Sequence, residues 1–314
     1  MQTGLVGWLH PRSSSLPCPS RCAESPRVSW FWENQIGSTM NERLRPVNSR
    51  QNNAVKELRR AFQSGSPTDD GYSAVEGVHL IEEAIRSGLR FKTVFFSESA
   101  EIRAAKLLPQ LASQVETLLL PDDVFESAVL TDSPQGVAAL VRLKSFKFED
   151  LLHADNPLFL GVAGLQDPGN LGTILRSAEA FGATGVLLGE RTVSPWNPKV
   201  IRGSSGSVFR LPVAKVAWEN AIAPLHEAGV KLWATSSHKG TPLQEVDLSG
   251  PSVVIVGSEG AGIPSELLAA VDGLLAIPHS PKVESLNAGI AASIVMYVAA
   301  RQLQHLTRSH GDSE

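Results

Sequence analysis

The sequence predicts an α/β protein with two domains: a small amino-terminal α/β domain and a larger α/β domain built on a parallel sheet. Three observations support this. The 314 residues exceed the roughly 150 residues of an average domain about twofold. Strand-like and helix-like segments alternate from residue 43 onward. Runs such as residues 253–256, with the sequence VVIV, are typical of parallel strands buried on both faces.

The composition excludes several classes of protein. With 42% hydrophobic and 19% charged residues, the chain is not wholly disordered. Its net charge of −4 excludes a histone-like polycation, although a local basic patch can still bind nucleic acid. Cys18 and Cys22 are the only cysteines, and no Cys/His cluster accompanies them, so we expect neither a disulfide scaffold nor a metal site. No apolar run could span a bilayer, so we expect a cytoplasmic protein without a membrane partner.

The pattern also predicts domain limits. Residues 1–40 lack sustained periodicity and the continuous apolar core of a secretory signal, so they are interpreted as a disordered tail or a mis-assigned start, with Met40 as the alternative first residue. The remaining divisions are a substrate-binding domain at 41–143, a linker at 144–157, the second domain at 158–306 and a disordered tail at 307–314.

The amino-terminal domain begins with a basic amphipathic helix. Val55, Leu58 and Phe62 form its apolar stripe, while Lys56, Arg59 and Arg60 belong to a stretch, 42–60, with a net charge of +4. An ordinary solvated helix face is the alternative interpretation. A strand end and helix over 74–88, strands at 91–96, 115–120 and 136–143, and helices at 101–114 and 122–129 complete this domain.

The second domain starts with a strand at 158–162 and continues the alternation. Helices are predicted at 171–181, 217–227, 264–270 and 285–304, and strands at 185–188, 208–213, 231–235, 252–256 and 274–276. Ligands of open α/β sheets bind at the carboxyl ends of the strands. Three polar or glycine-rich segments follow such ends.

The first segment spans residues 166–176. Asp167-Pro168-Gly169 forms a turn, and Asn170 is expected to cap the helix that follows. Arg176 lies opposite the apolar stripe of that helix, so packing does not require it. The alternative is that Asn170 only caps the helix and that Arg176 is a solvated charge.

The second segment, residues 257–263, follows the buried strand with the sequence GSEGAGI. Its order of glycines differs from the dinucleotide-binding fingerprint, and the chain has no P-loop motif. Because the carboxylate of Glu259 is a poor neighbour for phosphates, the loop favours a ligand with donors or positive charge. A purely structural tight turn is the alternative.

The third segment, residues 275–287, leads into a long Ala-rich helix. Ser285 and Asn287 can both cap that helix. We expect His279 to be a solvated loop residue and assign it no role.

Together these segments resemble the SpoU/TrmH family of RNA ribose 2′-O-methyltransferases, which belong to the knotted SPOUT class. The three family motifs correspond to Asn170 and Arg176, to residues 257–263, and to Ile277-Pro278 followed by Ser285-Leu286-Asn287. His279 stands where the family usually has Met, and Pro281 where it usually has Gly. Residues 43–143 are similar to the substrate-binding domain that some members carry.

The resemblance implies a trefoil-knotted methyltransferase domain, S-adenosylmethionine as cofactor, a homodimer and no metal. It places the cofactor in a site made by Thr235, Ser236, Gly257, Gly260, Ile277 and Leu286. It places the catalytic centre at Asn170, Arg176, Glu259, Ser285 and Asn287, with Arg176 supplied near the cofactor of the partner subunit.

Chemistry limits the role of Arg176. Family proposals make this arginine a base, but a guanidinium is always protonated in proteins. We expect it instead to hold the phosphate beside the target ribose.

Lys56, Arg59 and Arg60 are expected to bind the RNA backbone. By resemblance to family members that carry an extra amino-terminal domain, we expect large-subunit (23S-type) rRNA as the substrate, with tRNA second.

Two rival functions remain at this stage. One is a non-catalytic RNA-binding protein of the same fold, and the other is an α/β enzyme that binds a dinucleotide. Binding of S-adenosylmethionine distinguishes the methyltransferase from both.

Overall fold

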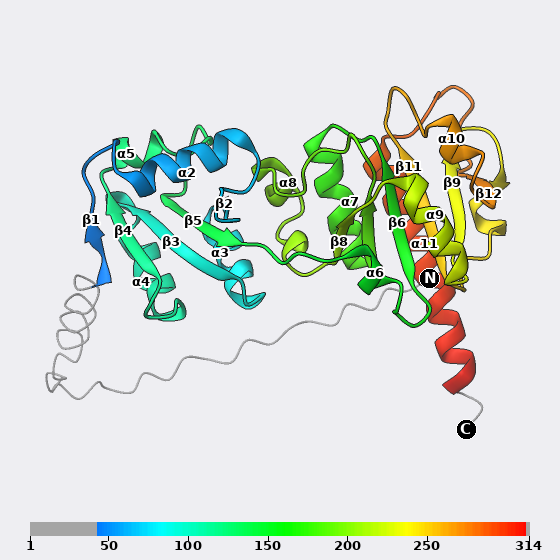
Figure 1. Cartoon of the computed structure of the whole chain (residues 1–314), viewed down its shortest axis with the longest axis horizontal. Helices are drawn as coiled ribbons and strands as arrows, with labels where there is room; N and C mark the ends of the chain where they lie inside the picture. Colours follow the sequence, from blue (N-terminus) through cyan, green and yellow to red (C-terminus); the bar gives the residue numbers. More distant parts are fainter. Residues whose placement is uncertain (1–42, 312–314) are drawn as a thin grey trace, which may run out of the picture. The chain divides into compact units, whose positions relative to one another are not determined.

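The computed structural model describes residues 43–311, with side chains through residue 303 (Figure 1). The predictions for residues 1–40, including the alternative start at Met40, lie outside the described residues. In the part described, none of the helices combines the length and apolar character that crossing a bilayer requires.

The first sheet has five strands in the order β1–β4–β3–β5–β2. Its strands are β1 (Arg45–Pro46), β2 (Ser73–Glu76), β3 (Arg90–Ser97), β4 (Glu116–Leu120) and β5 (Val137–Arg142). Strand β4 is parallel to β1 and β3, whereas β5 is antiparallel to β3 and β2. The helices are α2 (Asn53–Ser64), α3 (Val78–Arg86), α4 (Glu101–Leu107) and α5 (Asp122–Glu126).

Alternation along β3 explains why helices cover both faces of this sheet. Phe95 packs in the cluster that contains Leu58 of α2 and Phe125 of α5. Its neighbour Phe96 packs in the cluster that contains Ile81 of α3, on the other face. All of these side chains are fully buried, and each contributes about 1.5–3 kcal/mol of burial free energy.

The second sheet has seven parallel strands in the order β10–β12–β9–β11–β6–β7–β8. They are β6 (Leu158–Ala163), β7 (Gly185–Leu188), β8 (Val213–Lys215), β9 (Lys231–Ser236), β10 (Thr241–Pro242), β11 (Ser252–Gly257) and β12 (Gly273–Ala276). The helices are α6 (Phe148–Leu151), α7 (Pro168–Ala180), α8 (Pro198–Gly203), α9 (Trp218–Glu227), α10 (Ser265–Leu268) and α11 (Ala288–Gly311).

Both faces of this sheet are covered, as the VVIV run predicted. Val254 and Val256 of β11 pack in one hydrophobic cluster with residues of α7 and α11. Val253 and Ile255 pack in another with residues of α9 and α10. Helix α7, which follows β6, and helix α10, which follows β11, therefore cover opposite faces although their strands are neighbours. A crevice at the strand ends is expected where this happens.

Several predicted boundaries were wrong for identifiable reasons. Residues 208–213 are not a strand: a 3-10 turn spans Ser207–Phe209, and β8 begins only after Pro212, which has no N–H to donate to a ladder. Helix α4 ends at Leu107, where a 3-10 turn containing Pro109 follows. Helix α11 starts at Ala288 rather than 285 and reaches Gly311, so it includes residues that the sequence had assigned to a tail.

Candidate active site

Three side chains, from the first turn of α7, the loop after β11 and the loop before α11, meet at the carboxyl ends of β6 and β11. The amide of Asn170 donates to Glu259 Oε1 at 2.5 Å, and the amide of Asn287 donates to the same oxygen at 2.8 Å. Asn287 also donates to Asn170 Oδ1 at 2.9 Å. The three predicted residues thus form a closed hydrogen-bonded triangle, which we name the polar triangle.

The position of Asn170 corrects the predicted helix cap. The cap is Asp167, whose carboxylate accepts the backbone N–H of Asn170 at 2.7 Å, and Pro168 takes the first helical position, where no N–H is needed. The sequence offered two capping residues three positions apart. Because Asp167 caps the helix, the side chain of Asn170 is free to bond Glu259.

Helix α11 positions the third member of the triangle. Its cap is Asn287, whose Oδ1 accepts the backbone N–H of Ile290 at 3.2 Å. The nitrogen of the same side-chain amide donates the two hydrogen bonds by which Asn287 joins the polar triangle. Ser285 does not cap the helix. It is exposed in the preceding loop, where no hydrogen bond of its side chain is formed within the described residues.

Gly257 lets the glycine-rich loop turn tightly after β11. A Cβ at this position would lie 2.6 Å from the nitrogen of Ile263 and 2.7 Å from the oxygen of Gly262, which are backbone atoms that cannot rotate away. Beyond it, Ser258 and Gly262 pair through two backbone hydrogen bonds of 3.2 and 3.0 Å. Gly262 has a φ of 66°, a conformation that favours glycine. This hairpin presents Glu259 at its tip.

A cavity of about 350 Å³, which we name the loop cavity, lies between this hairpin and the loops after β9 and β12. The six residues predicted to bind a cofactor all line it: Thr235, Ser236, Gly257, Gly260, Ile277 and Leu286. Glu259 and Ser285 line it as well. The structure therefore brings the predicted cofactor residues to one place.

His279 also lines the loop cavity, in contrast to the prediction of a solvated histidine. Its ring is half-buried, Nδ1 bonds to the carbonyl of Ile277 at 2.7 Å, and the ring stacks on His238 with the centroids 5.2 Å apart. The two histidines come from different loops, so no local pattern links them. In the sequence, the only indication that these histidines could lie near the site is that each belongs to a polar segment that follows a predicted strand.

Arg176 does not join the polar triangle. It is exposed on α7, six residues after Asn170, and forms no hydrogen bond or ion pair with the described residues. The exposed position agrees with its place off the apolar stripe. Within one chain, the structure assigns it no partner among residues 43–303.

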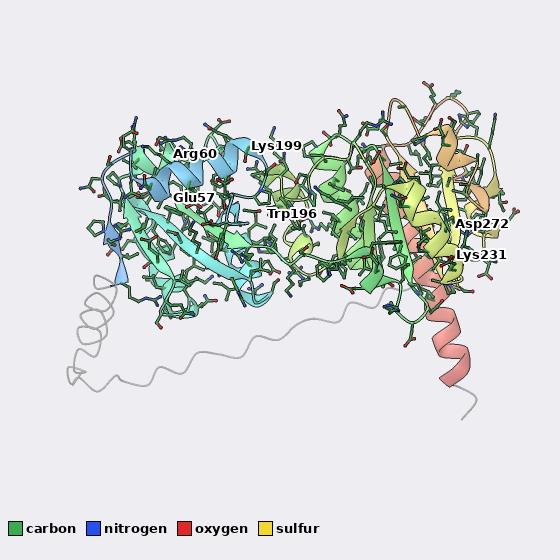
Figure 2. The ribbon with its side chains drawn as sticks, viewed as in Figure 1. Glu57, Arg60, Trp196, Lys199, Lys231 and Asp272 are labelled. Carbon is green, nitrogen blue, oxygen red and sulfur yellow. The ribbon has the colours of Figure 1, made fainter. Side chains whose placement is uncertain are left out.

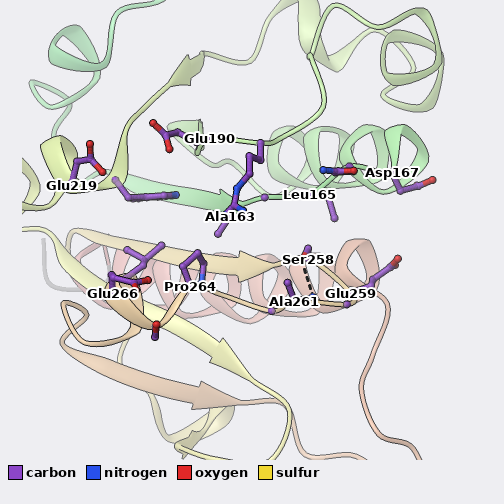
Figure 3. Close-up of a pocket in the computed structure, with 18 of the residues that line it drawn as sticks. Ala163, Leu165, Asp167, Glu190, Glu219, Ser258, Glu259, Ala261, Pro264 and Glu266 are labelled. Carbon is purple, nitrogen blue, oxygen red and sulfur yellow. Dashed lines mark hydrogen bonds between the residues drawn. The ribbon is translucent and has the colours of Figure 1, made fainter.

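A larger cavity of about 890 Å³, the acidic cavity, lies on the other side of the hairpin (Figure 3). It opens at the crevice between β6 and β11. The carboxylates among its lining residues are Asp167, Glu190, Glu219, Glu259 and Glu266, and the only lining cation is Arg191. In Figure 3, Asp167 lies across the cavity from Glu259, and Glu190 and Glu219 lie across it from Glu266. Except for Asp167 and Glu259, sequence analysis had not singled out these acids.

The predicted RNA-binding residues lie on α2, far along the chain from the polar triangle. Figure 2 labels Arg60 and Glu57 on this helix. Arg60 is exposed, but Arg59 is half-buried and donates to the carbonyl of Ser127 at 2.8 Å and to its hydroxyl at 3.0 Å. Arg59 thus binds the end of α5, whereas Lys56 and Arg60 have no partner among the residues described.

Among the described residues, no group of three or more His, Cys, Asp or Glu side chains is arranged to hold a metal ion. The site consists of the polar triangle and two cavities, which share residues 258–262 and are both lined by Glu259.

Residues 157–297 match the SpoU rRNA Methylase family, and residues 52–139 match the MRM3-like substrate binding domain. An uncharacterized tRNA/rRNA methyltransferase of Synechocystis sp. is 37% identical over 264 residues, covering 82% of this chain and 93% of that protein. The 23S rRNA (guanosine(2553)-2′-O)-methyltransferase RlmP of Bacillus subtilis is 32% identical, covering 81% and 98%.

Solved structures give the same result. The crystal structure of an rRNA methyltransferase from Sinorhizobium meliloti with bound S-adenosylmethionine superposes with a TM-score of 0.74 at 30% identity. It covers 83% of this chain and 99% of that one.

Proposed function

Because this chain belongs to the SpoU rRNA methylase family and is an RNA methyltransferase that uses S-adenosylmethionine, we propose that it methylates a ribose 2′-oxygen in large-subunit rRNA. The single observation that carries the proposal is the polar triangle, which joins residues of all three motif segments beside the loop cavity. The relative from Bacillus subtilis, named for this reaction on 23S rRNA, supports the choice of substrate.

The loop cavity fits the cofactor. Its walls are formed by loop backbone, by the hydroxyl-bearing residues Thr235 and Ser236, and by the apolar side chains of Ile277 and Leu286. A flat purine can lie between apolar groups while backbone N–H and C=O groups bond its edge. Gly257 supports this surface indirectly, because a side chain at this position would collide with the backbone of Gly262 and Ile263 and force the hairpin open.

S-adenosylmethionine supplies a methyl group that is already activated by the sulfonium. The protein must position the ribose hydroxyl in line with it and make the oxygen more nucleophilic. In the proposed reaction a bond forms between the methyl carbon and the 2′-oxygen, the carbon–sulfur bond breaks to leave a neutral thioether, and the hydroxyl proton passes to solvent water. Glu259 suits this task because Oε1 is held by two amides while Oε2 has no partner among the residues described. We assign Oε2 the hydrogen bond that orients the 2′-hydroxyl.

The acidic cavity is where the target nucleoside enters in this proposal. Its carboxylates repel phosphate groups, so the base and sugar face the cavity and the backbone remains outside. An enzyme that modifies a nucleotide commonly extrudes it from its helix into such a pocket. Arg176, exposed and without a partner, is assigned to the flanking phosphate.

The trefoil knot and the homodimer belong to the same proposal. Helix α11 exposes Ile290 and Tyr297, seven residues apart on one face, and the ring of Tyr297 packs edge-to-face on Phe181 at the end of α7. Covering such an apolar face against a second copy would bring α7, and with it Arg176, towards the partner's site.

Mixed dimers test the placement of Arg176. Arg176→Ala and Gly257→Ala proteins, each inactive alone, should regain activity when mixed if one subunit supplies Arg176 to the other. Each mixed dimer then has one intact site. No recovery, with subunit exchange verified, would place Arg176 in its own subunit's site.

Deletion of the gene, followed by mapping of 2′-O-methylation across all stable RNAs, tests the substrate. We expect one large-subunit rRNA methyl to disappear and to return with the wild-type gene but not with Arg176→Ala. Loss confined to tRNA would replace the substrate and keep the reaction. No lost methyl in any stable RNA, together with no binding of S-adenosylmethionine, would favour a non-catalytic RNA-binding role. A cytoplasmic location remains a prediction.

A further inference from the structure

A cross-strand row of two arginines and a tyrosine lies at one end of the first sheet. The register of β3 and β5 places Arg90 directly opposite Arg142. The guanidinium carbon of Arg142 lies 4.7 Å from the ring centroid of Tyr72, the residue that leads into β2. Tyr72, Arg142 and Arg90 thus follow one another across three strands. We name this set the arginine row.

Two like charges directly opposite each other on neighbouring strands destabilise a sheet. The nearby carboxylates do not neutralise both arginines. Lys92 forms ion pairs with Glu57 and Asp70, at 2.7 and 2.9 Å. Arg142 donates to the backbone carbonyl of Asp70 at 2.6 Å, and not to its carboxylate.

Three cations therefore face two carboxylates, and the excess charge is at Arg90. The side chain of Arg90 is exposed and forms no ion pair or hydrogen bond within the described part of the chain. An anion between the two guanidinium groups would relieve the repulsion and receive charge-assisted hydrogen bonds from both.

A cavity of about 440 Å³ adjoins the row. Tyr72, Leu89 and Phe91 give it aromatic and apolar walls, and Gln110 and Gln114 add amide groups. Arg90 is the only charged residue of its lining. Single-stranded RNA is recognised by such a combination: a base stacks on an aromatic or guanidinium plane, its edge bonds polar side chains, and its phosphate meets a cation.

We infer that the arginine row and this cavity bind an unpaired nucleotide of the RNA substrate, with its phosphate between Arg90 and Arg142 and its base beside Tyr72. The inference rests on the proposed function, because it takes RNA as the substrate. It adds a binding site in the amino-terminal domain that is separate from the polar triangle and from the basic face of α2. An anionic protein surface is the alternative occupant, which the experiment below distinguishes.

The experiment measures binding of a fluorescein-labelled single-stranded RNA of mixed sequence, and of its duplex, to the full-length protein by anisotropy at several salt concentrations. Arg90→Ala should weaken binding of the single strand severalfold at low salt and reduce the log–log salt slope by about 0.7, the value for one phosphate contact on a single strand. Arg90→Lys should restore the slope. Arg86→Ala is the matched control, since Arg86 is exposed in the same domain but already paired with Glu82 and Glu83.

The base contact has its own variants. Tyr72→Leu should weaken binding of the single strand at least about fivefold without changing the salt slope, whereas Tyr72→Phe keeps the stacking surface and the affinity. Thermal unfolding of each variant separates lost binding from lost folding. Arg90→Ala remains decisive if Tyr72→Leu unfolds.

Two results would overturn the inference: an unchanged salt slope in Arg90→Ala, or an equal loss for single strand and duplex. The first would favour a protein partner, and the second would mean a general backbone contact. Methyl transfer and S-adenosylmethionine binding are measured on the same preparations. If the wild-type protein transfers methyl groups while Arg90→Ala binds normally, only this inference fails. If the wild type transfers none, the proposed function fails instead.

Discussion

Substitution of Gly257 by alanine tests how the glycine-rich loop forms the cofactor site. The added Cβ would lie 2.6 Å from Ile263 N and 2.7 Å from Gly262 O, whereas non-bonded heavy atoms prefer about 3.5–4.0 Å. The hairpin must therefore open by about 1 Å. The two backbone hydrogen bonds between Ser258 and Gly262 would then weaken or break.

The magnitude follows from these contacts. Overpacking costs about 1–3 kcal/mol, and each lost hydrogen bond about 0.5–1.5 kcal/mol net. Overpacking and two lost hydrogen bonds together cost about 2–6 kcal/mol. If the loop opens while the rest of the fold is unchanged, this free energy is lost from S-adenosylmethionine binding, and Kd rises by roughly thirtyfold to twenty-thousandfold.

Isothermal titration calorimetry with S-adenosylmethionine measures this change, and thermal unfolding shows whether stability is lost as well. Gly260→Ala controls for the loss of glycine itself, because its Cβ would meet nothing within 4 Å. We expect Gly260→Ala to unfold at the wild-type temperature. A Gly257→Ala protein with unchanged affinity and unchanged unfolding temperature would refute the reasoning.

Three further predictions concern side chains elsewhere. Arg176→Ala should fold normally but lose methyl transfer by at least about a hundredfold, as expected for loss of a positioning group; near-normal rates would remove Arg176 from the site. Arg59→Ala should lower the unfolding temperature because two hydrogen bonds to Ser127 are lost. Arg60→Ala should change only RNA binding and its salt slope. The reverse pattern would contradict a structural role for Arg59 and an RNA-binding role for Arg60. Burial raises the pKa of Glu76 above its usual value, against a smaller opposing effect of its hydrogen bond from Thr131. Since the folded pKa exceeds the unfolded one, stability falls as pH rises between the two, so Glu76→Gln should raise the unfolding temperature at pH 7 and lose that advantage near about pH 4. An advantage that is independent of pH would show that the charge of Glu76 is not the cause.

The strongest sequence signals were those with a physical rule behind them. The VVIV run predicted a strand covered on both faces, and β11 is such a strand. The rule that ligands bind at the carboxyl ends of parallel strands predicted the place of the site. The family resemblance supplied its residues, of which Asn170, Glu259 and Asn287 bond one another. In these cases local pattern and tertiary structure agree.

Other features depend on contacts that no local pattern contains. Asp167 and Asn170 are both good caps, and only the structure shows that Asp167 is the one used. The stack of His238 on His279 joins two loops from different strands. The pairing of Arg90 with Arg142 depends on a register shift between Phe91 and Thr93, which alternation along β3 does not reveal.

The most direct test of the central claim is transfer of a labelled methyl group from S-adenosylmethionine to rRNA purified from the deletion strain, followed by complete alkaline hydrolysis. A 2′-O-methyl group removes the hydroxyl that attacks the neighbouring phosphodiester, so we expect all the label to appear in an alkali-resistant dinucleotide. Label in mononucleotides would mean methylation of a base, and would contradict the claim that the ribose 2′-oxygen is the acceptor.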